Sequence, residues 1–193
     1  MSGRLMILVG CALMFIASSY TEAREKRIGL FNSPKGLGLS LQVDNRNGDE
    51  IRCFNVYADC YGVFSARTSD LGLAASFTHN YIFGVYDYEH LRLSVYGGAG
   101  VLLGYVHDYE KGLFSRDEQT RVLSRDMGFN ACLDCNAGLG LDFDRGITID
   151  LSLSLCPGII IRRDRYTGSA LVSLYKLGVF NVWMPQLCLY YRF

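Results

Sequence analysis

Two cysteines are separated by two residues, a spacing that redox sites and zinc sites use. Cys132 and Cys135 form a C-x-x-C pair, which redox sites and zinc sites use with both thiols converging on one point. The residues around them alternate between apolar and polar, as in a β-strand, so positions 132 and 135 face opposite sides. The pattern therefore predicts two residues of a β-sheet wall and no redox or zinc site.

The remaining cysteines suggest the same role. The chain has seven cysteines, and six remain when Cys11 is removed with the N-terminal signal peptide predicted below. An even number of cysteines in an exported chain is typical of disulfide-bonded proteins. However, the alternation places Cys132 opposite Gly158 and Cys156 opposite Asp134, so the two thiols are diagonal neighbours. Diagonal neighbours lie ~7 Å apart, too far for comfortable disulfide geometry. We expect most cysteines to be small wall residues.

The three histidines are scattered. His79 shares the parity of its aromatic neighbours Phe77 and Tyr81, which places it on the apolar side of a strand. His90 and His107 each stand at a strand end with no partner nearby in sequence. No phosphate-binding glycine loop or metal-ligand cluster is visible. We therefore assign no catalytic, cofactor-binding or metal site from the sequence.

The longest alternating segment runs from Phe129 to Arg162. It is interrupted by the three turn residues Asp144-Arg145-Gly146, a pattern typical of a hairpin whose third loop residue is left-handed. If Phe143 faces Ile147, the apolar residues of both strands fall on one side. These apolar residues are Phe129, Ala131, Leu133, Cys135, Ala137, Leu139, Leu141, Phe143, Ile147, Ile149, Leu151, Leu153, Leu155, Pro157, Ile159 and Ile161.

Similar alternation recurs along the chain and predicts eight strands, centred near residues 38, 57, 76, 98, 135, 154, 173 and 189. We expect residues 24–34 to be a short lead-in and residues 107–126 to be a solvated loop. Half of the residues are hydrophobic, with 13 Tyr, 11 Phe and 21 Gly. This composition favours an all-β domain. The formal net charge of zero gives no reason to expect nucleic acid as a partner.

The polar faces decide which kind of barrel the strands form. A soluble barrel places long charged side chains outside, whereas a membrane barrel places apolar side chains outside and small or polar groups inside. Here the polar faces carry Gly, Ser, Asn and Asp, which favours a single antiparallel up-and-down transmembrane β-barrel. We expect an inner polar network that includes Asp59, Asp134, Asn136, Asp150, Ser154, Arg92, Arg162 and Arg192. We expect aromatic girdles at Phe77, Tyr81, Phe83, Tyr105 and Phe143.

The N-terminus carries a separate signal. Arg4 precedes an apolar block from Leu5 to Ala17, and small polar residues follow it. This order predicts a secretory signal peptide over residues 1–23, cleaved after Ser19 or Ala23, and a barrel domain over residues 24–193. A minority alternative is a lipoprotein acylated at Cys11, although the apolar block continues beyond that cysteine.

The signal peptide, the eight alternating segments and the ending Leu187-Cys188-Leu189-Tyr190-Tyr191-Arg192-Phe193 resemble the small eight-stranded outer-membrane β-barrel proteins of Gram-negative bacteria. The resemblance covers residues 35–193. It implies location in the outer membrane, contact with outer-membrane lipids, and recognition of the strand ending in Phe193 by the outer-membrane assembly machinery. It leaves the oligomeric state open.

Three functions fit such a barrel. The leading hypothesis is a structural or interaction protein with a plugged polar interior. The second is a lipid-modifying enzyme: lipid A deacylases carry a His with a nearby Ser and Asn, and this chain has His79 and Asn80 but Tyr81 in place of serine. The third is a narrow pore. A soluble lipocalin-like carrier is a more distant alternative.

Two features conflict with the expected barrel. In the family, the chain ends and short turns lie in the periplasm, yet counting the eight predicted strands places Asp144-Arg145-Gly146 outside the cell and residues 107–126 in the periplasm. Either the strand count is off by one, with 81–89 and 165–185 as the segments to check, or this barrel has unusual loop lengths. Pro157 lacks the N–H that an interior strand uses, which predicts a β-bulge there.

Overall fold

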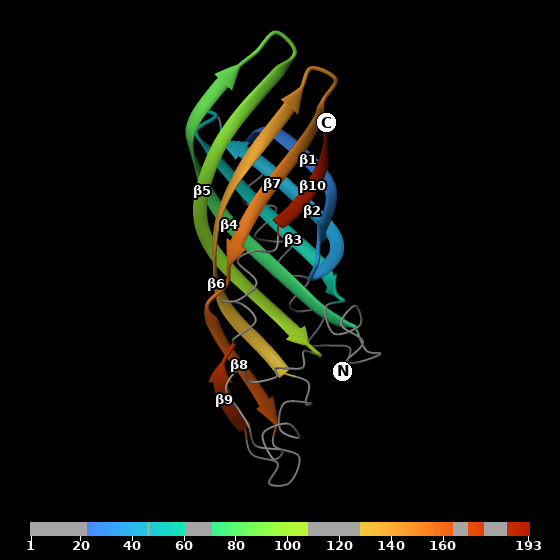
Figure 1. Ribbon diagram of the computed structural model, residues 1–193, viewed down its shortest axis with the longest axis vertical. Helices are drawn as coiled ribbons and strands as arrows, with labels where there is room; N and C mark the ends of the chain where they lie inside the picture. Colours follow the sequence, from blue (N-terminus) through green and yellow to red (C-terminus); the bar gives the residue numbers. More distant parts are fainter. Residues whose placement is uncertain (1–22, 46, 61–70, 108–127, 164–169, 176–184) are drawn as a thin grey trace.

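A computed structural model of the chain describes residues 23–45, 47–60, 71–107, 128–163, 170–175 and 185–193 (Figure 1). Apart from Ala23, the expected signal peptide lies outside these residues. No helix in the described part of the chain is long and apolar enough to cross a membrane. The described strands are β1 (Ala23–Ser33), β2 (Gly36–Asn45), β3 (Glu50–Asp59), β4 (Gly72–Asp87), β5 (Leu91–Val106), β6 (Gly128–Phe143), β7 (Ile147–Leu155), β8 (Gly158–Arg163), β9 (Ala170–Leu174) and β10 (Pro185–Arg192).

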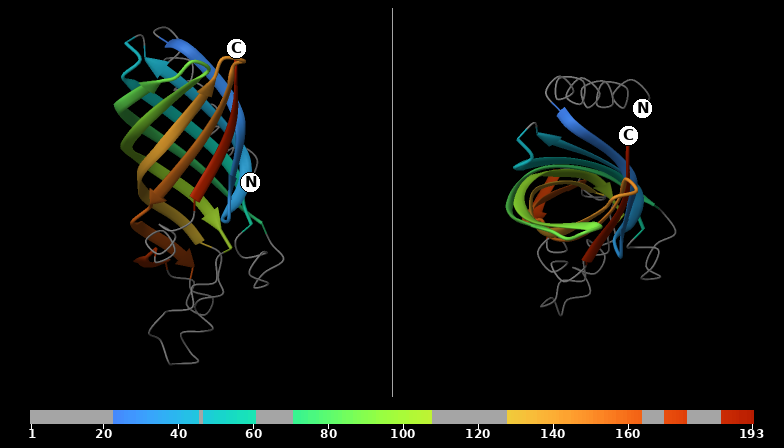
Figure 2. Two further views of the ribbon diagram at one scale, coloured as in Figure 1. Left: turned by 45° about the horizontal axis from the view of Figure 1, so that its top comes forward. Right: turned by 90° about the horizontal axis from the view of Figure 1, so that it is seen from above.

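The strands close into a barrel, which Figure 2 shows from above. Each strand from β1 to β7 pairs antiparallel with the next, β7 pairs with β10, and β10 returns to β1. Eight strand positions therefore surround the interior, and closure leaves no free edge in that ring. The predicted all-β, eight-stranded, up-and-down antiparallel barrel is confirmed.

The ring closes with a stagger. From Ile28 the pairing leads through β2, β3, β4 and β5 to Leu133 on β6. In the other direction it leads through β10 and β7 to Phe143 on the same strand. The two end points are ten residues apart, so the strands must tilt strongly against the barrel axis. Figure 1 shows this tilt.

The predicted long hairpin is confirmed. Phe143 pairs with Ile147, and Gly146 adopts φ +77°, the left-handed conformation expected for the third loop residue. Leu133 is 59% exposed on the outer face, whereas Asp134 and Asp150 are 3% and 4% exposed inside the barrel. Both strands therefore present their apolar side outward, as predicted.

The predicted strand list was wrong in two places. Residues 24–34 are not a lead-in: Ala23–Ser33 forms β1, which pairs on both sides. Its exterior residues Ile28 and Leu30 are apolar, but Glu25, Lys26 and Arg27 obscure the alternation at its start. The other error concerns 170–176, because β9 is not a separate member of the ring and pairs only with β8 among the described strands.

Counting β1 corrects the expected orientation. The turn 144–146 lies at the same end as the start of β1 and the end of β10, where the Arg192 amide donates to the Gly146 carbonyl and the Phe193 amide to that of Lys26. We call this the turn end. The connection between Val106 and Gly128 leaves from the opposite end, which we call the loop end. Short turns at one end of the barrel and longer connections at the other are what transmembrane barrels show.

Pro157 interrupts a strand without changing its register. β6 pairs with β7 from Phe143 to Cys135 and then with β8 from Cys132 to Gly128. The register is identical on both sides of the break, so the predicted bulge at Pro157 is wrong. The Pro157 carbonyl still accepts a hydrogen bond from Leu133, so only the bond that needs a Pro157 N–H is lost. A bulge occurs instead in β4, between Ile82 and Gly84.

The polarity of the barrel is inverted relative to a soluble domain. Large apolar side chains are exposed all around the outer wall, and polar and charged side chains are buried within it. Leu30 on β1 is 62% exposed, whereas Asn80 and Asn130 inside the ring are fully buried. The exposed outer residues include Leu39, Val56, Phe77, Val101, Leu103, Leu139, Leu151, Leu153, Leu187 and Leu189.

Small residues on the inner face make room for large neighbours. A Cβ atom on Gly138 would lie 2.5 Å from Cζ of Tyr96 and 2.9 Å from the carbonyl oxygen of Leu151. The Tyr96 hydroxyl in turn donates a 2.8 Å hydrogen bond to Asp150. Glycine at position 138 therefore leaves the space that the Tyr96 ring occupies.

We expect Gly138→Val to destabilise the barrel by about 1–3 kcal/mol, because the new side chain must displace the Tyr96 ring. The measurement is the urea midpoint of the refolded protein in detergent micelles, followed by circular dichroism. Ala131→Val adds similar bulk on the outer face of the same strand and should leave the midpoint unchanged. Equal midpoints for the two variants would contradict this account.

Candidate functional site

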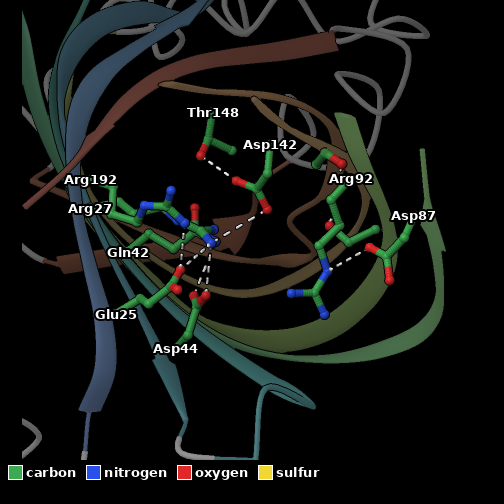
Figure 3. Close-up of polar contacts among 11 residues, drawn as sticks. Glu25, Arg27, Gln42, Asp44, Asp87, Arg92, Asp142, Thr148 and Arg192 are labelled. Carbon is green, nitrogen blue, oxygen red and sulfur yellow. Dashed lines mark hydrogen bonds and ion pairs between the residues drawn. The ribbon is translucent and has the colours of Figure 1, made fainter. Parts of the chain in front are cut away.

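Polar side chains meet inside the barrel at the turn end (Figure 3). Arg27 lies at their centre, with a side chain only 7% exposed. Its Nη2 atom lies 3.0 Å from a carboxylate oxygen of Asp44, 3.1 Å from one of Glu25 and 3.4 Å from one of Asp142. These ion pairs join three strands, β1, β2 and β6. The Arg27 cluster consists of Glu25, Arg27, Gln42, Asp44, Asp142, Thr148 and Arg192.

The outer members of the Arg27 cluster support its carboxylates. The Thr148 hydroxyl donates a hydrogen bond to Asp142. The Gln42 amide nitrogen lies 3.5 Å from Asp44, and Nη1 of Arg192 lies 3.4 Å from Glu25. Three carboxylates thus share two guanidinium groups inside a closed wall. Such a network stabilises the fold only while each charge keeps its partners.

A neutral chain of hydrogen bonds lines the inner wall at the middle of the barrel. The Ser40 and Tyr190 hydroxyl oxygens lie 2.7 Å apart. Ser40 also donates to Asn55, whose side-chain amide donates a 3.2 Å hydrogen bond to Ser76. Ser40 and Asn55, and Asn55 and Ser76, are ladder partners, so the bonds follow the wall from β10 past β1 to β4.

An apolar cluster fills the interior towards the loop end. Phe31 and Tyr57 stack with ring centroids 4.7 Å apart, and Tyr175 is fully buried. Lys35 enters from the β1–β2 turn: its Nζ lies 3.4 Å from Asp59 and donates a hydrogen bond to the Tyr175 hydroxyl. The cluster consists of Phe31, Tyr57, Ala74, Leu102, Val106, Cys132, Cys156, Ile160, Tyr175, Cys188 and Tyr190.

The charged residues predicted from sequence do not form a single network. Asp59 pairs with Lys35, and Asp150 accepts from Tyr96 in the middle of the barrel. Arg92 lies beside Asp87 at the end of the β4–β5 hairpin, with both side chains exposed. Of the predicted residues Asp59, Asp134, Asp150, Arg92, Arg162 and Arg192, only Arg192 joins the Arg27 cluster.

The centre of that cluster was missed from sequence. Arg27 and Glu25 lie in the segment that the sequence predicts to be a lead-in. In the structure, Asp44 belongs to β2 and pairs across the ladder with Ile51. The available signal was the parity of Arg27 with Gly29 and Phe31, which places it inside once Ile28 and Leu30 are recognised as exterior residues.

The cysteines lie where the alternation predicted. Cys132 is buried inside, Cys135 is exposed outside, and Cys132 pairs with Gly158. The Cys156 thiol lies 3.6 Å from a carboxylate oxygen of Asp134. The six cysteines of the described residues form no disulfide, and no group of three His, Cys, Asp or Glu residues in the described ranges could hold a metal ion.

His79 lies on the outer wall, where sequence parity placed it. Its ring stacks on Tyr81 with centroids 5.0 Å apart. Its Nε2 atom lies 3.3 Å from a carboxylate oxygen of Glu50, a partner not recognised from sequence. In register, Glu50 faces Tyr81, which makes it a diagonal neighbour of His79. Within the described ranges, no serine or threonine hydroxyl hydrogen-bonds to His79.

Comparisons with known proteins give a low level of similarity to two solved structures. No protein-family model matches the chain, and no curated protein matches it. Among solved structures, the N-terminal β-barrel domain of Pseudomonas aeruginosa OprF is similar, with a TM-score of 0.43 and 14% identity over 90% of this chain and 100% of that one. Yersinia pestis outer membrane protein Ail in a phospholipid bilayer nanodisc is similar, with a TM-score of 0.40 and 16% identity over 88% of this chain and 99% of that one. At these scores, the fold assignment rests on the strand register of this chain.

We expect Arg27→Met to destabilise the barrel by roughly 3 kcal/mol or more, because it leaves buried carboxylates without their partner. The measurement is again the urea midpoint in micelles. Lys26→Met removes a positive charge from the adjacent exterior position and should have a much smaller effect. Adding Asp44→Asn to Arg27→Met should recover part of the loss, since it removes one unpaired charge. No recovery would contradict a role for unpaired charge.

Proposed function

We propose that this protein is an outer-membrane β-barrel with a closed, packed interior and a structural or interaction role. The observation that supports the proposal best is the inverted polarity of the wall. Leu39, Val101 and Leu151 lie on different sides of the ring and are all exposed. Water would disfavour a continuous exposed apolar surface of this kind, whereas the acyl chains of a bilayer would not.

The ring itself suits a bilayer. Each strand of the ring pairs on both sides, so the ladder satisfies the backbone N–H and C=O groups of the wall apart from local interruptions at Pro157 and at the β4 bulge. β4, β5 and β6 each contain 16 residues, more than the ~9–11 that a tilted strand needs to cross. Tyr81 and Phe83 towards the turn end and Tyr105 towards the loop end are exposed, as girdle residues would be.

The packed interior favours a structural role over a pore. The Arg27 cluster crosses the turn end, buried and hydrogen-bonded polar side chains line the middle, and the apolar cluster around Tyr175 fills the loop end. Eight strands enclose a space that side chains can fill. With each level occupied, an ion would have to separate buried partners to pass.

Partners follow from the same proposal. Lipids would cover the outer wall, and the assembly machinery would recognise the last strand through Phe193. In the structure, the Phe193 amide donates to the Lys26 carbonyl, so the C-terminal residue lies beside β1 where the ring closes. Its side chain is 66% exposed, which leaves it accessible for recognition.

A lipid-modifying enzyme is the second candidate, and the contact between His79 and Glu50 is the observation that favours it. A carboxylate can orient a histidine that acts as a base. Tyr81 in place of serine weighs against it. Release of fatty acid from lipid A by the purified, refolded protein, and its loss in His79→Ala, would establish this activity.

We expect the protein expressed in a Gram-negative host to be found in the outer-membrane fraction and to migrate differently on gels before and after heating. A closed barrel resists detergent until heated, which is the physical reason for the shift. Recovery of the protein only in the soluble fraction would refute the membrane assignment and favour a lipocalin-like carrier.

We expect no stepwise conductance from the refolded protein in planar lipid bilayers, because the interior is occupied at each level. A larger barrel with a known open channel serves as the positive control for insertion. Reproducible unitary steps from the wild-type protein would overturn the plugged interior and favour the narrow pore.

A further inference from the structure

A groove of about 690 Å³ crosses the outer wall where β4, β5 and β6 lie side by side. Gly97, Ala99 and Ala137 form its floor, because Gly97 pairs with Ala137 and Ala99 follows two residues later on the same face. No large side chain rises from these positions. The volume falls within the range of sites that bind small ligands.

Aromatic side chains form the rim. His79, Tyr81 and Phe83 line the β4 side of the groove, and Tyr81 pairs with Gly97. The bulge between Ile82 and Gly84 leaves Phe83 without a partner in the ladder and 75% exposed. The groove is therefore built by small residues on two strands and by a bulge on the third.

The groove lies where the outer wall changes from charged to apolar. Along β3 the exterior positions are Glu50 and Arg52, followed by Phe54 and Val56 towards the loop end. Arg52 pairs across the ladder with His79, the rim residue. The half-buried Arg52 side chain forms no ion pair or hydrogen bond with any residue in the described part of the chain. An unpaired positive charge thus stands beside an apolar groove.

We propose that this groove binds one phospholipid, with an acyl chain on the floor of Gly97, Ala99 and Ala137 and the anionic phosphate paired with Arg52. The proposal rests on the membrane location proposed above and places the lipid in the leaflet on the side of the turn end. A guanidinium group pairs readily with phosphate oxygens through two parallel hydrogen bonds. Glu50 is paired with His79 and does not neutralise Arg52 in the described residues.

A phospholipid fits the groove better than a second copy of this chain. In a two-fold symmetric dimer through this wall, each copy would present the same patch, so each Arg52 would approach the other. A lipid instead brings the opposite charge and a narrow apolar tail together. The charged Arg52 beside the apolar floor of the groove matches the charged head and apolar tail of such a lipid.

The test uses the full refolded protein in detergent micelles, with palmitoyl-oleoyl phosphatidylglycerol as the probe and native mass spectrometry as the readout. We expect wild type to retain one lipid. Ala137→Leu fills the floor and Arg52→Gln removes the phosphate partner, so each should lower the retained fraction at least fivefold. Ala131→Leu, on the same face of β6, and Lys26→Gln, which removes another exterior charge, should match wild type.

Equal retention by all five proteins, equal loss in Ala137→Leu and Ala131→Leu, or dimers in place of lipid adducts would each overturn the proposal. Heat-dependent gel migration checks that every variant is folded, and Arg52→Gln decides the question if Ala137→Leu does not fold. A barrel that enters the outer membrane but retains no lipid would refute only this inference. A protein absent from that membrane would refute the proposed function itself.

Discussion

The pairing of β1 with β10 is the constraint on which the rest of this structure depends. Without it, both strands would present unpaired backbone groups along an edge, and the sheet would be open. With it, every edge of the ring is satisfied, and the wall separates an inside from an outside. The contacts between Arg27 and Asp142 and between Arg192 and Glu25 require this closure, because each joins a residue of β1 to a strand from the second half of the chain.

Closure also explains why the two faces differ so sharply in chemistry. The interior of an eight-stranded ring is narrow, so its side chains must be small or must share their space with neighbours, as Gly138 does with Tyr96. Polar groups there can bond to one another across the ring, as Arg27 on β1 and Asp142 on β6 do. The exterior has no such partners within the wall, and apolar side chains predominate there.

Much of this fold could be predicted from the sequence because a two-residue period is a direct geometric signal. The register of the long hairpin, the separation of Cys132 from Cys135 and the outward position of His79 all follow from parity alone. β1 was missed because its first residues are charged on both faces. Charged residues on both faces are typical of a solvated segment before the first strand. Their role in the wall is recognised only when the residues that they contact on other strands are known.

The functional sites were harder to predict because they depend on distance across the ring. Arg27 and Asp142 are 115 residues apart in sequence, and the pattern around neither one indicates the other. The contact between Glu50 and His79 depends on the exact register of β3 against β4. At Pro157 the local rule predicted a β-bulge, and this prediction was wrong. The pairing of β6 with β7 and then with β8 keeps one register on both sides of the proline.

The ten-residue stagger of the ring has a consequence for how depth in a bilayer relates to sequence. The pairing from Ile28 reaches β6 at Leu133 in one direction around the ring and at Phe143 in the other. A path from each residue to its ladder partner therefore follows a helix around the barrel. Residues at one depth are therefore not ladder partners. To stay at one depth in the bilayer, a path must move along the strand by about one and a quarter residues from the ladder partner for each strand that it crosses. A belt of lipid headgroups around this protein would thus touch positions that no single row of the sheet contains.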